Sequence, residues 1–392
     1  MRKKRIPWLL IALVLPVLLV GTVLASLSQS KLEGGVPPTQ NPEDPKVYLP
    51  AIYNIYPPPG FPGVAPDLYV DHPLTLTDVS ADVGTIVWQT PGMQDQAIAL
   101  LYGTPGCLDR DTIGPYMPLG AGFIKPDDVI STSIAFARSW YGNTRSDFDS
   151  QLTLIIAVNN YMPDYAGLES ACGADFAHRF GRMWGDVVNR VISGTVIYRP
   201  QVRVVIGGDF EVGWATFDQT KAMIEGIIET SNCTPSGHEG GCLFNIASAG
   251  GCPQTYGNFG GCNDGWTLGN VYGYAQGMKR VGDSFSFVKP FPMFYANHGE
   301  NNYQWVNVSF WGTQNGQFYL WFLGSTTQNA RCQAAKSAEC KVTDYPPTTA
   351  WCKLRDLLLS HRELVQFAPR WASDVVRQAE YFLFKPETPP CQ

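Results

Sequence analysis

Strand-like and helix-like segments alternate from about Thr85 to Gln392, and this alternation constrains the fold more than any other feature of the chain. Short apolar runs of β-type residues predict the strands. The strand candidates are Ala97–Tyr102, Thr153–Asn159, Val202–Gly208, Leu243–Ala247, Ser286–Tyr295 and Phe318–Gly324, with weaker ones at Thr85–Trp88, Gly120–Ile124 and Leu364–Phe367.

Amphipathic stretches separate these runs and predict helices. They are Asp128–Trp140, Asp175–Ile192, Phe217–Thr230, Leu268–Lys279, Asn302–Trp311, Thr348–Leu359 and Trp371–Phe382. Such an order implies parallel strands joined by crossover helices. It predicts an α/β fold, a (β/α)8 TIM-type barrel with loop insertions, over residues 85–392. A dinucleotide-binding sheet is disfavoured, because no Gly-x-Gly-x-x-Gly pattern follows the first strand.

The first 25 residues resemble a secretory signal peptide. Basic residues at positions 2–5 precede an apolar stretch from Trp8 to Leu24, and Val23 and Ala25 are the small residues expected before a cleavage site. The stretch is also long enough to span a bilayer, so an uncleaved N-terminal anchor is the alternative. Residues 26–84 follow as a Pro-rich linker with a short apolar tether at Val47–Tyr53. We therefore expect a secreted or extracytoplasmic cell-surface protein that meets a membrane only through its N-terminus, if at all.

The cysteine content agrees with export. The chain has ten cysteines and no Cys-x-x-Cys pair of the kind that binds zinc or performs redox chemistry. Their close spacing favours local disulfides at Cys233–Cys242, Cys252–Cys262 and Cys332–Cys340, although spacing alone leaves the full connectivity open.

The charge of the chain argues against a nucleic-acid partner. The formal net charge is −6, and no basic stripe remains once positions 2–5 are set aside. Aromatic residues make up 12% of the chain, which suits a stackable ligand such as a sugar as well as an aromatic core.

Two carboxylates, Asp209 and Glu211, follow the apolar strand Val202–Gly208. Side chains alternate along a strand, so the two acids are expected to point one way and Phe210 the other. Paired carboxylates at the carboxyl end of a barrel strand are what general acid–base cleavage of a glycosidic bond requires. The alternative is that both acids cap a turn or the next helix.

Other predicted strand ends supply candidate substrate contacts. They are Tyr102, Asn159, Asn160, Ser248, Tyr295, Asn297, His298 and Glu300. Trp214, just beyond Glu211, adds a possible sugar-stacking surface. A nucleophilic serine is disfavoured, because Ile246 stands where the first Gly of a Gly-x-Ser-x-Gly motif belongs before Ser248. The five histidines show no paired spacing, so we expect no metal and no cofactor.

The strand that ends Gly-Gly-Asp209-Phe210-Glu211 resembles the Asp-x-Glu strand of the N-acetylmuramidase group of glycoside hydrolase barrels. The resemblance implies that Glu211 is the proton donor and that Asp209 is its electrostatic or orienting partner. Those enzymes carry an acid at the end of the first strand, whereas Ala97–Gly103 has none.

Two functions follow from these patterns. The first is an extracytoplasmic glycoside hydrolase that acts on a polysaccharide or a cell-wall glycan such as peptidoglycan. The second is a non-catalytic glycan-binding or cell-surface barrel, which the missing acid on the first strand favours.

Overall fold

The structure is a computed structural model that describes residues 67–69, 96–117, 122–144, 150–235, 241–294, 298–327, 347–361 and 364. Several sequence-based expectations lie outside these residues. They are the signal peptide or anchor, the strand Thr85–Trp88, the helix Trp371–Phe382, the disulfide Cys332–Cys340, and the site candidates Tyr295 and Asn297.

A six-stranded parallel sheet forms the centre of the fold, with its strands in chain order. The strands are β1 (Asp67–Tyr69), β2 (Gln96–Leu101), β6 (Leu152–Asn159), β7 (Val202–Asp209), β8 (Leu243–Asn245) and β9 (Val288–Pro290). Because crossovers between parallel strands are right-handed, a sheet whose order never reverses places its helices on one face. The predicted α/β class with parallel strands is confirmed.

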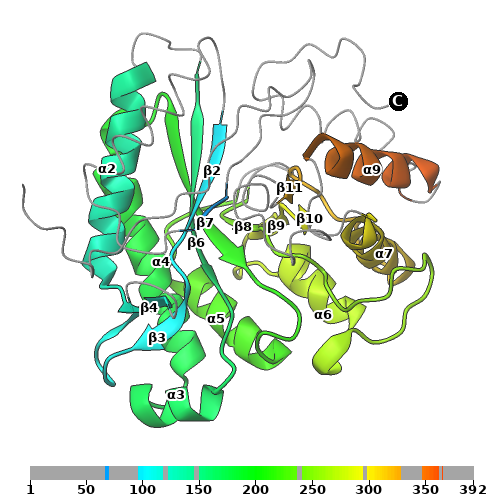
Figure 1. Ribbon diagram of the computed structural model, residues 1–392, viewed down its shortest axis with the longest axis horizontal. Helices are drawn as coiled ribbons and strands as arrows, with labels where there is room; N and C mark the ends of the chain where they lie inside the picture. Colours follow the sequence, from blue (N-terminus) through cyan, green and yellow to red (C-terminus); the bar gives the residue numbers. More distant parts are fainter. Residues whose placement is uncertain are drawn as a thin grey trace, which may run out of the picture. The chain divides into compact units, whose positions relative to one another are not determined.

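The helices follow the strands one by one. They are α2 (Pro126–Thr144), α4 (Phe176–Gly194), α5 (Phe217–Thr230), α6 (Leu268–Tyr272), α7 (Glu300–Gln314) and α9 (Pro347–Ser360). Figure 1 shows α2, α4 and α5 beside β2, β6 and β7, and α6, α7 and α9 beside the shorter strands later in the chain. Helix α4 packs against both α2 and α5. Among the described residues, no helix is both long enough and apolar enough to cross a membrane.

Helices α4 and α5 show how the sequence produces this layer. In α4, Phe176, Phe180 and Trp184 recur every fourth residue and are buried. Helix α5 begins with a capping box in which Thr216 and Gln219 bond each other's backbone N–H groups. The two helices touch where a Cβ on Gly181 would lie 1.9 Å from the Met223 carbonyl oxygen, so only glycine fits there.

The two faces of the sheet have separate apolar clusters. The larger one joins the sheet to the helices. The smaller one consists of strand and loop residues from the opposite face, hereafter the inner face. Its buried members are Ala99, Leu101, Ile155, Ala157, Val205, Phe244, Ile246 and Phe291.

The first part of the structure differs from the prediction in three ways. The predicted strand Gly120–Ile124 is β5 (Gly122–Phe123) of a separate antiparallel sheet with β3 (Thr104–Cys107) and β4 (Ile113–Met117). Helix α3 (Tyr165–Cys172) has no counterpart in the prediction. Strand β1 lies within residues 26–84, the range assigned to linker and tether, and pairs with β2.

The last strands are also shorter than predicted. The segment Ser286–Tyr295 contains β9 and β10 (Met293–Phe294), separated at Pro292, whose ring nitrogen cannot donate to a neighbouring strand. In the predicted strand Phe318–Gly324, the Leu323 N–H donates to the Pro290 carbonyl, but the regular strand β11 is Thr326–Thr327.

Disulfides connect the described cysteines, none of which is free. The predicted pairs Cys233–Cys242 and Cys252–Cys262 are confirmed. A third pair, Cys107–Cys172, joins β3 to the end of α3. Disulfides of this kind are typical of proteins in oxidising compartments.

Candidate functional site

The two acids lie at the carboxyl end of β7, and both are buried. Asp209 is 1% exposed and Glu211 is 6% exposed. Phe210 points into the helix-side core, where its ring fills the space that a side chain on Gly208 would occupy. Asp209 follows Val205 and Gly207 in alternation, which places it on the inner face. Charged groups are seldom buried without a partner, so these two need a local explanation.

Ser248 provides that explanation for Glu211. The Ser248 backbone N–H donates to Glu211 Oε1 at 3.0 Å, and its hydroxyl donates to Oε2 at 2.5 Å. The Gly250 N–H donates in turn to the Ser248 hydroxyl oxygen at 3.2 Å. Hydrogen bonds to a carboxylate favour its charged form and fix its orientation.

Asn160 fixes the backbone of the same glutamate. Its side chain accepts from the Glu211 N–H at 3.0 Å and donates to the Glu211 carbonyl at 3.0 Å. A further bond to the Thr220 hydroxyl ties it to α5. Asn160 is completely buried, so its amide is committed to this role. The prediction places Asn159 in the site; it pairs with Asp209 across β6 and β7 and caps the turn at Tyr161.

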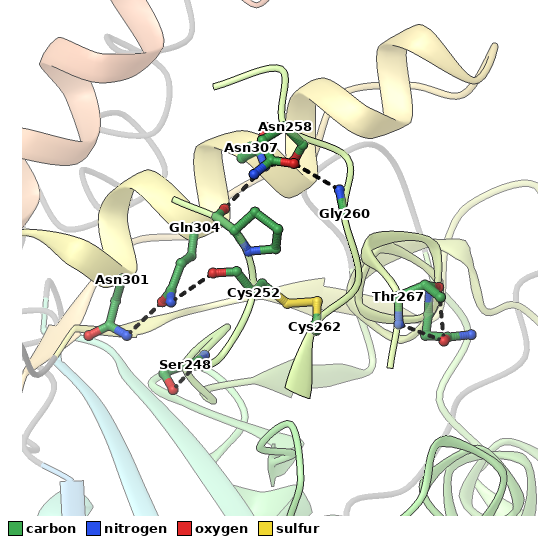
Figure 2. The surroundings of a disulfide bond; sticks show 12 residues. Ser248, Cys252, Asn258, Gly260, Cys262, Thr267, Asn301, Gln304 and Asn307 are labelled. Carbon is green, nitrogen blue, oxygen red and sulfur yellow. Dashed lines mark hydrogen bonds between the residues drawn. A yellow bond between two sulfur atoms is a disulfide. The ribbon is translucent and has the colours of Figure 1, made fainter. Parts of the chain in front are cut away.

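The loop that carries Ser248 is held by α7. Gln304 donates to the Cys252 carbonyl at 3.1 Å, and Asn307 donates to the Pro253 and Asn258 carbonyls. Figure 2 shows these amides along α7, facing the Cys252–Cys262 disulfide. The loop after β8 is therefore pinned both by the disulfide and by a helix that follows it in sequence.

Tyr274 and Asn245 complete the polar surroundings of the acids. Tyr274 is fully buried and lies in η3, the π-helical turn Gly273–Gly277. Burial, together with the charges on Glu211 and Asp209, raises the pKa of the Tyr274 hydroxyl well above its ordinary value, while the Asn245 amide lowers it. The phenol therefore stays protonated across the range in which carboxyl groups titrate.

An aromatic pair lies close to the acids in the chain. The rings of Trp214 and Tyr161 meet edge to face at 5.8 Å between centroids. Their backbones are connected through the Met162 N–H, which donates to the Trp214 carbonyl at 2.9 Å. Tyr161 is 43% exposed and Trp214 is half-buried, so the pair offers an accessible apolar surface. Tyr161 was absent from the predicted site, although its position two residues after the end of β6 was a usable signal.

Tyr102 and His298 have different surroundings. The expectation of a substrate contact does not hold for Tyr102, which is fully buried and bonds the Ser133 hydroxyl of α2 at 2.8 Å. Strand alternation explains this, because Leu101 belongs to the inner face and Tyr102 therefore faces the helices. His298 is exposed and lies two residues before α7, next to its N-cap Gly299. Within the described ranges, no cluster of three or more His, Cys, Asp or Glu side chains has the geometry to hold a metal ion.

Comparisons with known proteins add little to this geometry. No family model matches the sequence, and no curated protein matches it. Among solved structures, the chain is similar to the hyperthermostable endo-1,4-beta-D-mannanase from Thermotoga petrophila RKU-1. That similarity has 11% identity and a TM-score of 0.35, and covers 76% of this chain and 85% of the mannanase. This degree of similarity is too low to bear on fold or function, and none of the comparisons points to the N-acetylmuramidase group.

Proposed function

We propose that this protein is an exported glycoside hydrolase that acts on a polysaccharide or cell-wall glycan, with Glu211 as general acid and Asp209 as its electrostatic partner. The observation that carries the proposal is the burial of two carboxylates at the carboxyl end of one strand of a parallel sheet. Ligands bind at this edge of such sheets, and a pair of carboxylates forms the usual catalytic groups of glycoside hydrolases.

The hydrogen bonds of Ser248 suit a carboxyl group that both gives and takes a proton. A serine hydroxyl has one proton and two acceptor lone pairs, and it rotates to suit its neighbour. It donates to charged Glu211 and can accept from the protonated form. Asn160 keeps the Glu211 backbone in place in both states. Asp209 would stabilise the positive charge that develops on the sugar ring at the transition state.

The proposal includes a closed barrel. The inner-face cluster is buried, and all of its members come from strands and loops. A sheet that curves until its edges meet buries this face with its own strands, which agrees with a strand order that never reverses.

The test is to compare wild type with Glu211→Gln on peptidoglycan, chitin and plant polysaccharides including mannan. The amide keeps the shape of the carboxyl group but cannot deliver a proton, so the rate of cleavage should fall about 10²–10⁴-fold. Asp209→Asn should also lower the rate. Glu225→Gln is the control, because Glu225 is an exposed glutamate of α5 paired with Lys221.

Cleavage that survives Glu211→Gln with a wild-type rate would remove Glu211 from the mechanism. Binding without cleavage by the wild type would support the second candidate, a non-catalytic glycan-binding protein. The observation that favours this second candidate is the accessible pair Trp214–Tyr161, which offers a stacking surface that needs no catalysis.

A further inference from the structure

One buried tyrosine near the acids has no part in the chemistry above. Tyr274 comes from η3, which continues directly from α6, and its ring meets Trp266 edge to face at 5.3 Å. Trp266 is itself fixed by a bond from its indole N–H to the Ala215 carbonyl at 3.0 Å. π-Helical turns are rare and occur frequently at functional sites. The packing therefore holds the phenol ring in one place.

Asn245 interacts both with this tyrosine and with the backbone that carries the acids. It pairs with Gly208 across β7 and β8, and its side-chain oxygen faces the Phe210 N–H at 3.4 Å and the Ala247 N–H at 3.3 Å. Phe210 is the residue that separates Asp209 from Glu211. The Asn245 oxygen therefore anchors the backbone of the acid pair, and its amide nitrogen turns toward Tyr274.

Asn245 and Tyr274 each contribute one buried hydrogen-bond donor to this part of the structure. Neither the Asn245 amide nitrogen nor the Tyr274 hydroxyl has a hydrogen-bond partner within ordinary distance among the described residues. Buried polar groups without partners are rare in folded proteins and call for an explanation. The charges that raise the pKa of the Tyr274 hydroxyl, in addition to its burial, are those of Glu211 and Asp209. A neutral O–H beside two carboxylates has a direct use as a donor.

We propose that Tyr274 is a positioning residue of this site, whose hydroxyl, oriented by Asn245, acts as a fixed hydrogen-bond donor to the Asp209–Glu211 pair through one water molecule. The inference deepens the proposed function, but its structural part stands on burial, register and the two unpartnered donors. Because the phenol stays protonated while carboxyl groups titrate, it stabilises their charged form throughout that range.

The experiment is a titration of the carboxyl groups by ¹³C NMR in protein labelled at the side-chain carboxyl carbons of Asp and Glu. Tyr274→Phe removes the donor and should move the titration of the Asp209–Glu211 pair to higher pH by about one unit. Tyr272→Phe is the matched control. Tyr272 is a buried tyrosine of the neighbouring helix α6, and its hydroxyl donates to the Phe318 carbonyl at 2.8 Å. It should leave the acid titration unchanged.

A second measurement needs no Tyr274 variant. In wild type labelled at the tyrosine Cζ carbon, the Tyr274 signal should follow the titration of the acid pair, and the Tyr272 signal should not. The proposal is overturned if Tyr274→Phe leaves the apparent pKa values of the Asp209–Glu211 pair unchanged. It is also overturned if the chemical shift of the Tyr274 Cζ carbon does not change as the pair titrates. Where a glycan is cleaved, the acidic limb of the pH–rate profile should shift with the carboxyl titration. Absence of any cleavage would defeat the proposed hydrolase alone, because the two NMR measurements do not depend on it.

Discussion

The inner face of β7 carries opposite charges at its two ends, and the groups that contact the charge differ between the two ends. Arg203 stands near the amino end, and Asp209 ends the strand about 20 Å further on. The Arg203 guanidinium lies 5.7 Å from the ring centroid of Phe244. Lys289, the partner of Phe244 in register on β9, lies 6.0 Å from the Trp321 ring centroid. At the amino end, therefore, the cationic side chains lie against aromatic rings.

The carboxyl end uses directed hydrogen bonds instead. Ser248 and Asn160 fix Glu211 through four bonds to its side chain and backbone. A ring face is a broad and weakly directional partner, whereas N–H and O–H donors define one orientation. The contrast indicates that the amino end of the sheet accommodates its charges without fixing their orientation, and that the carboxyl end holds Glu211 in one orientation.

Among the substitutions that test this contrast between the two ends, the largest effect should come from replacing Lys289. This side chain is 3% exposed, and its burial lowers its pKa from 10.5 to about 8. The unfolded chain therefore binds more protons between pH 8 and about 10.4, so stability should rise with pH across that window. Lys289→Met should abolish this rise. At pH 7 it should raise the free energy of unfolding by up to about 3 kcal/mol.

Denaturant unfolding between pH 7 and pH 10.5 measures this effect. The control is Lys221→Met, which removes an exposed lysine of α5 and should leave the pH dependence as in wild type. If Lys289→Met abolishes glycan cleavage without changing stability, the amino end belongs to the functional site and the contrast between the two ends fails.

A smaller effect should come from Ser248→Ala at the carboxyl end. The substitution deletes the hydroxyl donor to Glu211 Oε2 but keeps the backbone donor to Oε1. We expect a loss of about tenfold in cleavage rate, because one charge-assisted bond to the glutamate disappears while the other remains. Ser193→Ala removes a helix-surface hydroxyl that bonds the Asn189 carbonyl, and it should leave the rate unchanged. Equal rates for both variants would show that Ser248 does not position Glu211.

The smallest effect should come from Trp214→Ala. Loss of the exposed ring pair should weaken glycan binding by about 1 kcal/mol, roughly a fivefold change in the dissociation constant. Isothermal titration calorimetry with oligosaccharides of the cleaved glycan measures the change. Phe318→Ala removes an aromatic ring that is 75% exposed elsewhere and should leave affinity unaltered. The same loss in both variants would show that the pair is an ordinary surface feature.

The sequence predicted the regular elements well, because each has a strong local pattern. Helix α5 was predicted with its observed bounds, and β6 and β7 to within one residue. Tyr102 was misplaced because the prediction did not decide which face of the strand this residue occupies; Leu101 lies on the inner face, and alternation turns the Tyr102 ring toward α2. Local patterns decide period and length, but which of the two alternating faces meets the helices depends on how the sheet packs.

Long-range contacts were not predictable from local patterns. The bonds of Asn160 and Ser248 to Glu211 span 51 and 37 residues of sequence. The Cys107–Cys172 disulfide spans 65 residues, whereas the predicted pairs that were confirmed span 9 and 10. The site is thus built from side chains whose meeting depends on tertiary packing. Asn160 and Ser248 had a signal in their positions at predicted strand ends, but their bonds to Glu211 had none.

The attachment of the Ser248 loop to α7 has a consequence for the timing of assembly. Strand β7 and both acids leave the ribosome well before Gln304 and Asn307, which hold the loop through its carbonyl groups. The Cys252–Cys262 disulfide forms only in an environment that oxidises thiols. A partly synthesised or reduced chain therefore has its acids but lacks the support that orients Glu211. Completion of the site is therefore postponed until the chain is whole and its cysteines are oxidised.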